Sequence, residues 1–210
     1  MHLRRSSVMA AALLGGMLTA CAGGPPTKLV GAWQLPDYTP TAYQKVLVIG
    51  VTSEGGTRRI FEDAFCYQLK QRGVTAIASY TLIPEDGKVP NERLEAAIRE
   101  SGAQGVLTTR HIGTNTNVNY NQSYYRATPV YYDSFYGYYG NAYVFQEVPM
   151  AETATVVTLE SDMFDATKLK MIWSGTTQTT NPTSLSQEMA GFAKIVIDEM
   201  AKRGLLAVKP

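Results

Sequence analysis

The residues whose chemistry the sequence can bring together are Glu54, Arg110 and His111. Glu54 follows an apolar run over residues 45–51, and the other two end a second apolar run over residues 105–112. Such runs predict buried strands, and ligands of an open parallel sheet bind beyond the carboxyl ends of its strands. A carboxylate, a guanidinium and an imidazole at that edge predict a small-molecule site or a hydrolytic site. The alternative is a capped helix beside a rim ion pair.

The turn after the first strand, residues 54–57, has the sequence Glu-Gly-Gly-Thr and leads into a predicted helix with Thr57 as its N-cap. A helix N-terminus can bind an anion, although this turn is not a GxGxxG motif. The chain has no HExxH, GxSxG, P-loop or CxxC motif, and its two histidines are His2 and His111. The sequence therefore predicts no metal site and no cofactor.

The elements that would position these residues alternate between strand and helix. Strands are predicted over residues 45–51, 74–80 and 105–112, and helices over residues 57–72 and 90–102 from their apolar spacing. Gly73 and Gly102 are expected to end the two helices. Such alternation implies parallel strands joined by right-handed crossovers.

The second half of the chain predicts a hairpin and a helix. Residues 153–159 and 168–177 form the expected antiparallel strands, with Leu169, Met171 and Trp173 on a single buried face. A last helix is predicted over residues 184–203, with an inner stripe of Leu185, Met189, Phe192, Val196, Ile197 and Met200. The fold class is α/β: an open mixed sheet in two or three layers, β-α-β-α-β followed by an antiparallel hairpin and a C-terminal helix.

A tyrosine-rich insertion is predicted at about residues 113–143, which hold nine of the thirteen tyrosines. Tyrosine combines a rigid apolar ring with a hydroxyl and favours recognition surfaces, so the insertion predicts contact with a protein or a glycan. Nucleic acid is not expected, because cationic neighbours are scarce here. The alternative is a loop without a ligand. The candidate partner-binding residues are Tyr124, Tyr125, Tyr131, Tyr132, Tyr136, Tyr138 and Tyr139.

The first residues predict export and a lipid anchor. Arg4 and Arg5 precede an apolar run over residues 8–18, and small residues then lead to Cys21. This arrangement resembles the lipobox of bacterial lipoproteins, in which the cysteine is acylated, with palmitate for example, and becomes the first mature residue. The resemblance implies a signal peptide over residues 1–20 and, because Ala22 is not Asp, sorting to the outer membrane. The alternative is an ordinary signal peptide with a chance cysteine.

The remaining chain is expected to form a lipid-anchored tether over residues 21–44 and one α/β domain over residues 45–210. Its charge is nearly balanced, because 19 basic side chains lose Arg4 and Arg5 with the signal and 18 are acidic. Such a surface again argues against nucleic acid. Cys66 is expected to be a small buried side chain on a helix. Glu62, Asp63 and Glu100 are expected on solvated helix faces.

Two stretches carry a family resemblance. One joins residues 46–51 to residues 61–65 and 72–74, and the other is residues 163–175, with an Asp turn and a Trp. Together they resemble uncharacterised bacterial outer-membrane lipoproteins with an α/β fold, similar to the amino-terminal domain of the Tol-Pal periplasmic protein, the curli-secretion lipoprotein and the lipoprotein activators of penicillin-binding proteins.

The resemblance implies a non-enzymatic role in binding or assembling with another envelope component. The protein would be held at the outer membrane by its lipid and would face the periplasm or the cell surface. The alternatives are a small-molecule-binding or hydrolytic enzyme at the strand edge, and a structural lipoprotein whose tyrosine-rich loop is disordered.

Overall fold

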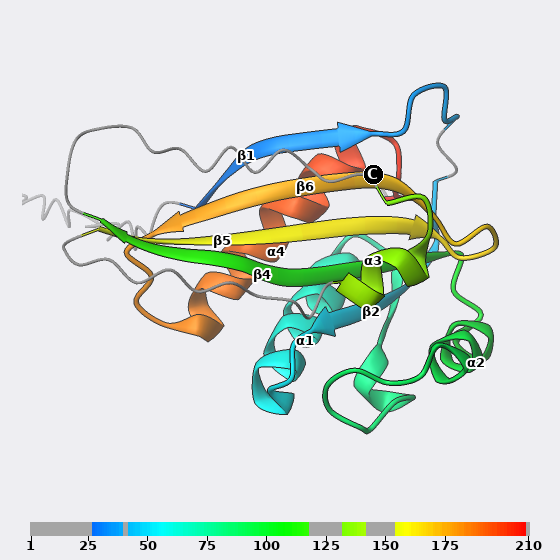
Figure 1. The fold of residues 1–210 in the computed structure, drawn as a ribbon. Coiled ribbons are helices and arrows are strands. Elements are labelled where there is room, and N and C mark those ends of the chain that lie inside the picture. The colour runs from blue at the N-terminus through cyan, green and yellow to red at the C-terminus, as the bar shows by residue number, and fades with distance from the viewer. Residues whose placement is uncertain (1–26, 40–41, 118–131, 142–153, 209–210) are drawn as a thin grey trace, which may run out of the picture.

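The computed structural model describes residues 27–39, 42–117, 132–141 and 154–208. Its centre is a six-stranded mixed sheet with the strand order β1-β6-β5-β4-β2-β3 (Figure 1). The elements in chain order are β1 (Thr27–Gln34), β2 (Lys45–Val51), α1 (Gly55–Gln71), β3 (Thr75–Ala78), a 3-10 turn (Ser79–Thr81), α2 (Asn91–Ser101), β4 (Gly105–Asn117), α3 (Phe135–Asn141), β5 (Ala154–Asp165), β6 (Lys170–Thr180) and α4 (Leu185–Lys202).

The predicted fold class is confirmed. β2 pairs in parallel with both β3 and β4, while β5 and β6 form an antiparallel hairpin that joins the sheet through β4. α1 and α2 end where expected, because Gly73 and Gly102 adopt the positive φ angles of 80° and 58° that glycine tolerates best. α1 begins two residues earlier than predicted, with Glu54 at its N-cap position.

The predicted tether is wrong in part. Residues 27–34 form β1, an edge strand that runs antiparallel to β6, and Leu35 continues the contact through its N–H to the carbonyl of Ile172 at 2.9 Å. The folded part of the chain therefore begins before residue 45. Cys21 and the signal peptide lie outside the described residues.

Helices cover both faces of the sheet. α1 and α4 pack on one face (Figure 1). There the rings of Phe65 and Phe192 meet edge to face, with their centres 5.3 Å apart. α2 and α3 cover the other face, where Phe135 of α3 contacts Phe164 of β5 at 5.1 Å. The structure thus has three layers, and Cys66 is buried on α1 as expected.

The hairpin has two buried faces, and the expectation of one is wrong. A β-bulge places Ile172 as an extra residue between the pairs Phe164–Met171 and Met163–Trp173. Because a bulge shifts the alternation of side chains, Met171 joins the core under α3 while Trp173 joins the core under α4. On α4, Leu185 is 41% exposed, whereas the five other members of the predicted stripe are buried.

Within the part of the chain that the structure describes, no helix combines the length and the apolar character that crossing a membrane requires.

Candidate functional site

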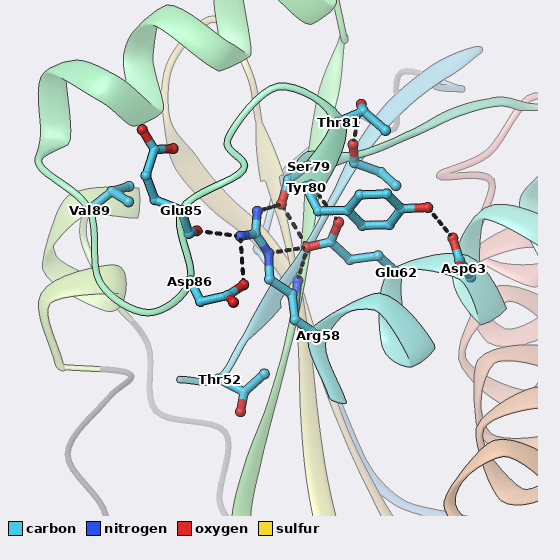
Figure 2. Close-up of polar contacts among 12 residues, drawn as sticks. Thr52, Arg58, Glu62, Asp63, Ser79, Tyr80, Thr81, Glu85, Asp86 and Val89 are labelled. Atoms are coloured by element: carbon cyan, nitrogen blue, oxygen red, sulfur yellow. Dashed lines mark hydrogen bonds and ion pairs between the residues drawn. The ribbon is translucent and has the colours of Figure 1, made fainter. Parts of the chain in front are cut away.

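The carboxyl ends of β2 and β3 surround a buried ion pair between Arg58 and Glu62 of α1 (Figure 2). Oε1 of Glu62 accepts hydrogen bonds from the Gly50 N–H at 3.0 Å, Arg58 Nε at 2.9 Å and Ser79 Oγ at 2.6 Å. Its Oε2 accepts the Tyr80 N–H at 2.9 Å. The Glu62 side chain is fully buried, and these four donors compensate its charge.

Arg58 extends this network to the loop before α2. Its Nη2 donates to Ser79 Oγ at 2.8 Å, its Nη1 donates to the Glu85 carbonyl at 2.7 Å, and the Asp86 carboxylate lies 4.0 Å from Nη1 (Figure 2). The Arg58 side chain is only 5% exposed. We call Arg58, Glu62 and Ser79 the edge network. It ties α1 to the ends of two strands and to the loop.

The start of α1, where the sequence predicted that an anion could bind, lies beside the carboxylate of Asp86. The Asp86 carboxylate lies so close to Gly55, the first residue of α1, that a Cβ at Gly55 would overlap with it. A carboxylate near a helix N-terminus is favourable because it complements the helix dipole. Asp86 therefore stands where an external anion was expected.

Glu62 corrects one expectation, since it was assigned to a solvated helix face and is fully buried. Its partners Gly50, Ser79 and Tyr80 come from other elements. Asp63 is exposed as expected and accepts the Tyr80 hydroxyl at 2.7 Å. Spacing of four residues between Arg58 and Glu62 was the one sequence signal for this pair.

The structure does not gather Glu54, Arg110 and His111 into one site. The sheet does bring their segments near one another, because Val51 and Arg110 are register partners. Consecutive strand residues point to opposite faces, however. Arg110 therefore lies under α3, while His111 pairs with Leu159 on the α4 side and bonds Thr114 Oγ1 at 2.8 Å. Glu54 is exposed and accepts the hydroxyl of Thr57 at 3.0 Å.

Arg110 belongs to a buried polar group on the α3 face. Its Nε and Nη2 donate to Oε1 of Glu160 at 2.9 and 2.8 Å, and its guanidinium lies 5.4 Å from the ring centre of Tyr138. Residues that are register partners on adjacent strands lie on the same face of a sheet. The residues of β4, β5 and β6 that are in register with this pair, or two positions along from it, therefore belong to the same group. We call this group the Asp162 cluster: Thr108, Arg110, Tyr138, Glu160, Asp162, Ser174 and Thr176.

Asp162 is the unusual member of the cluster. It is fully buried, and neither of its oxygens has a hydrogen-bond partner of good geometry among the described residues. Burial and the neighbouring Glu160 charge raise the pKa of Asp162 well above its ordinary value, while Ser174, Arg110 and Tyr138 oppose the rise only in part. The alternation of Glu160 and Asp162 along one strand was the sequence signal for this pair of carboxylates, and it was missed.

The candidate tyrosines divide by position. Tyr138 and Tyr139 are buried, so in this arrangement they belong to the core of the chain and offer no surface to a partner. Tyr132 and Tyr136 are partly buried, and the Tyr132 ring meets Tyr138 edge to face at 5.5 Å. Burial and then Glu95 raise the pKa of Tyr136 to about 12. Tyr124, Tyr125 and Tyr131 lie outside the described residues.

Comparisons with known proteins give weak likenesses. No family model and no curated protein matches the chain. Among solved structures, a PelC dodecamer from Paraburkholderia phytofirmans is 13% identical with a TM-score of 0.44, and the match covers 88% of this chain and 99% of that chain. A lipoprotein from Neisseria meningitidis is 13% identical with a TM-score of 0.39, over 75% of this chain and 98% of that chain.

A PDZ domain protein from Parabacteroides distasonis is 10% identical with a TM-score of 0.37, and the match covers 81% of this chain and 34% of that chain. At these scores the likenesses carry no conclusion about the activity or the partners of this chain. The class that the structure itself defines is an open mixed α/β domain with three layers.

Proposed function

We propose that this chain is a non-enzymatic lipoprotein of the bacterial cell envelope, anchored by an acylated Cys21, that binds a protein or glycan of the same envelope. The sequence from Arg4 to Cys21 supports the anchor, because a charged start, a short apolar run and small residues lead directly to the cysteine. Acyl chains hold a domain stably once two or more are present.

The observation that carries the binding role is the aromatic segment over residues 132–139. Phe135 and Tyr138 fix it to the sheet through Phe164, at ring distances of 5.1 and 5.2 Å. Tyr132 and Tyr136 remain partly exposed beside these anchors. Rigid tyrosines on a fixed support suit recognition, because little side-chain entropy is lost on contact.

The absence of catalysis is supported by what the candidate catalytic groups bind. Arg110 is held by Glu160 under Tyr138, and Glu54 is engaged by Thr57 at the start of α1. His111 faces the other side of the sheet from Arg110. A shared reaction centre would need these groups to converge on one substrate.

A photo-crosslinking amino acid at position 132 tests the binding role in intact cells. We expect a discrete crosslinked envelope component, lost when Tyr136→Ser is added and retained with Tyr67→Ser, which removes a 59% exposed tyrosine from α1. The proposal fails if the crosslinked set is the same in all three proteins. The anchor is tested separately, since Cys21→Ser should abolish palmitate labelling and release the protein from membranes.

A further inference from the structure

α3 lies over a group of ionisable side chains whose charges do not balance. β5 contributes two carboxylates on the α3 face, Glu160 and Asp162, and β4 contributes one cation, Arg110. The other groups that face Asp162 are the neutral hydroxyls of Thr108 on β4, Ser174 on β6 and Tyr138 on α3.

Arg110, the cation of this group, pairs with Glu160 and not with Asp162. Two of the three guanidinium nitrogens of Arg110, Nε and Nη2, contact Glu160 Oε1. Asp162 keeps no ion-pair partner of its own among the described residues, and its two oxygens and the hydroxyls of Ser174, Thr176 and Tyr138 make no hydrogen bond of good geometry there. A buried, unpaired carboxylate is costly, and such groups in proteins take up a proton to become neutral.

A neutral Asp162 fits this environment. A protonated carboxyl has one O–H donor and retains acceptor capacity, so it can share hydrogen bonds with the neighbouring hydroxyls of Ser174 and Tyr138. The ionised form would instead place a second negative charge beside Glu160 in a fully buried position. The direction of the pKa of Asp162 agrees with this geometry, since burial and Glu160 both raise it.

The position of α3 depends on its contacts with the sheet. It has seven residues, and a helix of that length is not stable alone. Its contacts include the rings of Phe135 and Tyr138 on Phe164, the Arg110 guanidinium on Tyr138, the Phe135 N–H to the Leu169 carbonyl at 2.8 Å, and two long bonds of 3.4 Å, from the Val89 N–H to the Tyr139 hydroxyl and from Lys88 Nζ to the Gly140 carbonyl. Tyr138 is fully buried against the Asp162 cluster, so a charge there acts directly on the docking of the helix.

We propose that a proton on Asp162 holds α3 on the sheet, and that loss of this proton releases the helix. Release would hydrate Asp162 and Glu160 and would bring Tyr138 and Tyr139 to the surface. That a partner would bind the released tyrosines rests on the proposed function. The proton-dependent docking of α3 does not depend on it.

The sign of the pH dependence follows from the two states. The pKa of Asp162 is raised in the docked state and ordinary, about 3.9, in the released state. The docked state is therefore fully favoured below the ordinary value and loses that advantage as pH rises through the raised pKa. Within this window the ratio of released to docked molecules grows up to tenfold per pH unit.

Hydrogen exchange of the full-length, detergent-solubilised protein tests the switch, read from peptides over residues 135–141 between about pH 4 and 9. After correction for the intrinsic pH dependence of exchange, we expect protection of α3 to fall up to tenfold per pH unit in the unaltered protein. Asp162→Asn, which imitates the neutral carboxyl, should keep α3 protected throughout. Glu100→Gln removes an exposed carboxylate from α2 and should behave like the unaltered protein.

Two results would overturn the switch. One is α3 protection that does not depend on pH in the unaltered protein, which would mean that water satisfies an ionised Asp162. The other is an unchanged pH dependence in Asp162→Asn. If that variant does not fold, Glu160→Gln decides, because it frees Arg110 for Asp162 and removes the neighbouring negative charge. The pKa of Asp162 in the docked state then falls toward its ordinary value, so α3 protection should depend less on pH than in the unaltered protein, and an undiminished pH dependence would reject the switch. A failure of the partner crosslink with intact pH dependence would reject the proposed function alone.

Discussion

Replacement of Arg58 by Met is the perturbation for which the structure gives the clearest magnitude. The guanidinium makes hydrogen bonds to Glu62 at 2.9 Å, Ser79 at 2.8 Å and the Glu85 carbonyl at 2.7 Å, and it is the cation nearest to a fully buried carboxylate. Methionine has a similar length but no charge and no donor. Glu62 would then keep its backbone donors and Ser79 but lose its ion pair.

Removal of one member of a buried ion pair typically costs about 3–5 kcal/mol, because the other charge stays buried without compensation. A domain of ordinary stability unfolds with about 5–15 kcal/mol, so this loss is a large share of the total. The matched control is Arg99→Met on α2. Its ion pair with Glu95, at 3.5 Å, joins side chains that are 72% and 44% exposed, and such a pair contributes about 0–1 kcal/mol.

Urea unfolding at neutral pH, followed by tryptophan fluorescence and by circular dichroism, measures both variants. The Arg58→Met midpoint should fall strongly with little change in slope, while the Arg99→Met midpoint should stay close to that of the unaltered protein. If Arg58→Met costs less than about 1 kcal/mol, or no more than the control, the edge network does not stabilise the fold as its geometry implies.

Three further results are expected. Burial raises the pKa of the Cys66 thiol to about 12, so iodoacetamide at pH 8 should modify it only after unfolding, and equal rates in native and unfolded protein would contradict this. Phe192→Ala should lower the free energy of unfolding by about 3–5 kcal/mol in the same urea assay, because Phe192 is fully buried. Leu185→Ala, at an exposed position, should lower it by less than about 0.5 kcal/mol. Similar losses in the two variants would contradict the assignment of Phe192 to the inner face of α4. Gly175→Ala should destabilise by about 1–3 kcal/mol because its Cβ would overlap the Trp173 ring, and an unchanged melting temperature would argue against that contact.

Local patterns were enough to predict the parallel half of the sheet and its helices. Apolar runs and helical spacing gave β2, α1, α2 and β4, and Gly73 and Gly102 ended the helices at positive φ. These signals are local, since each depends on residues within one element or just beyond it. The sequence could therefore specify the segment order without information on distant contacts.

The features that sequence reasoning missed depend on residues far apart in the chain. β1 has no alternating pattern and is a strand because β6 pairs with it, as in the pair Thr27–Thr179. The bulge at Ile172 reverses the faces of the following side chains, and it is visible only once β5 is beside β6.

The site was missed for the same reason. Glu62 has the sequence context of a solvated helix residue and is buried by Ser79 and Gly50, which other elements supply. Arg110 was expected at the end of its strand, but β4 continues to Asn117, and only β2 ends beside Arg110, at Val51. Its partner Glu160 lies fifty positions further along the chain. Composition and local spacing do not reveal which residues far apart in the chain will pair.

The edge strand β1 limits how far the domain can stand from a bilayer. Thr27 is the sixth residue after Cys21, and six residues of fully extended chain reach at most about 22 Å. A linker that ran to residue 44 would have reached several times further. If Cys21 carries the proposed acyl chains, the start of β1 stays within about 22 Å of the lipid headgroups, so the domain can rotate about this point but cannot move away from the membrane surface.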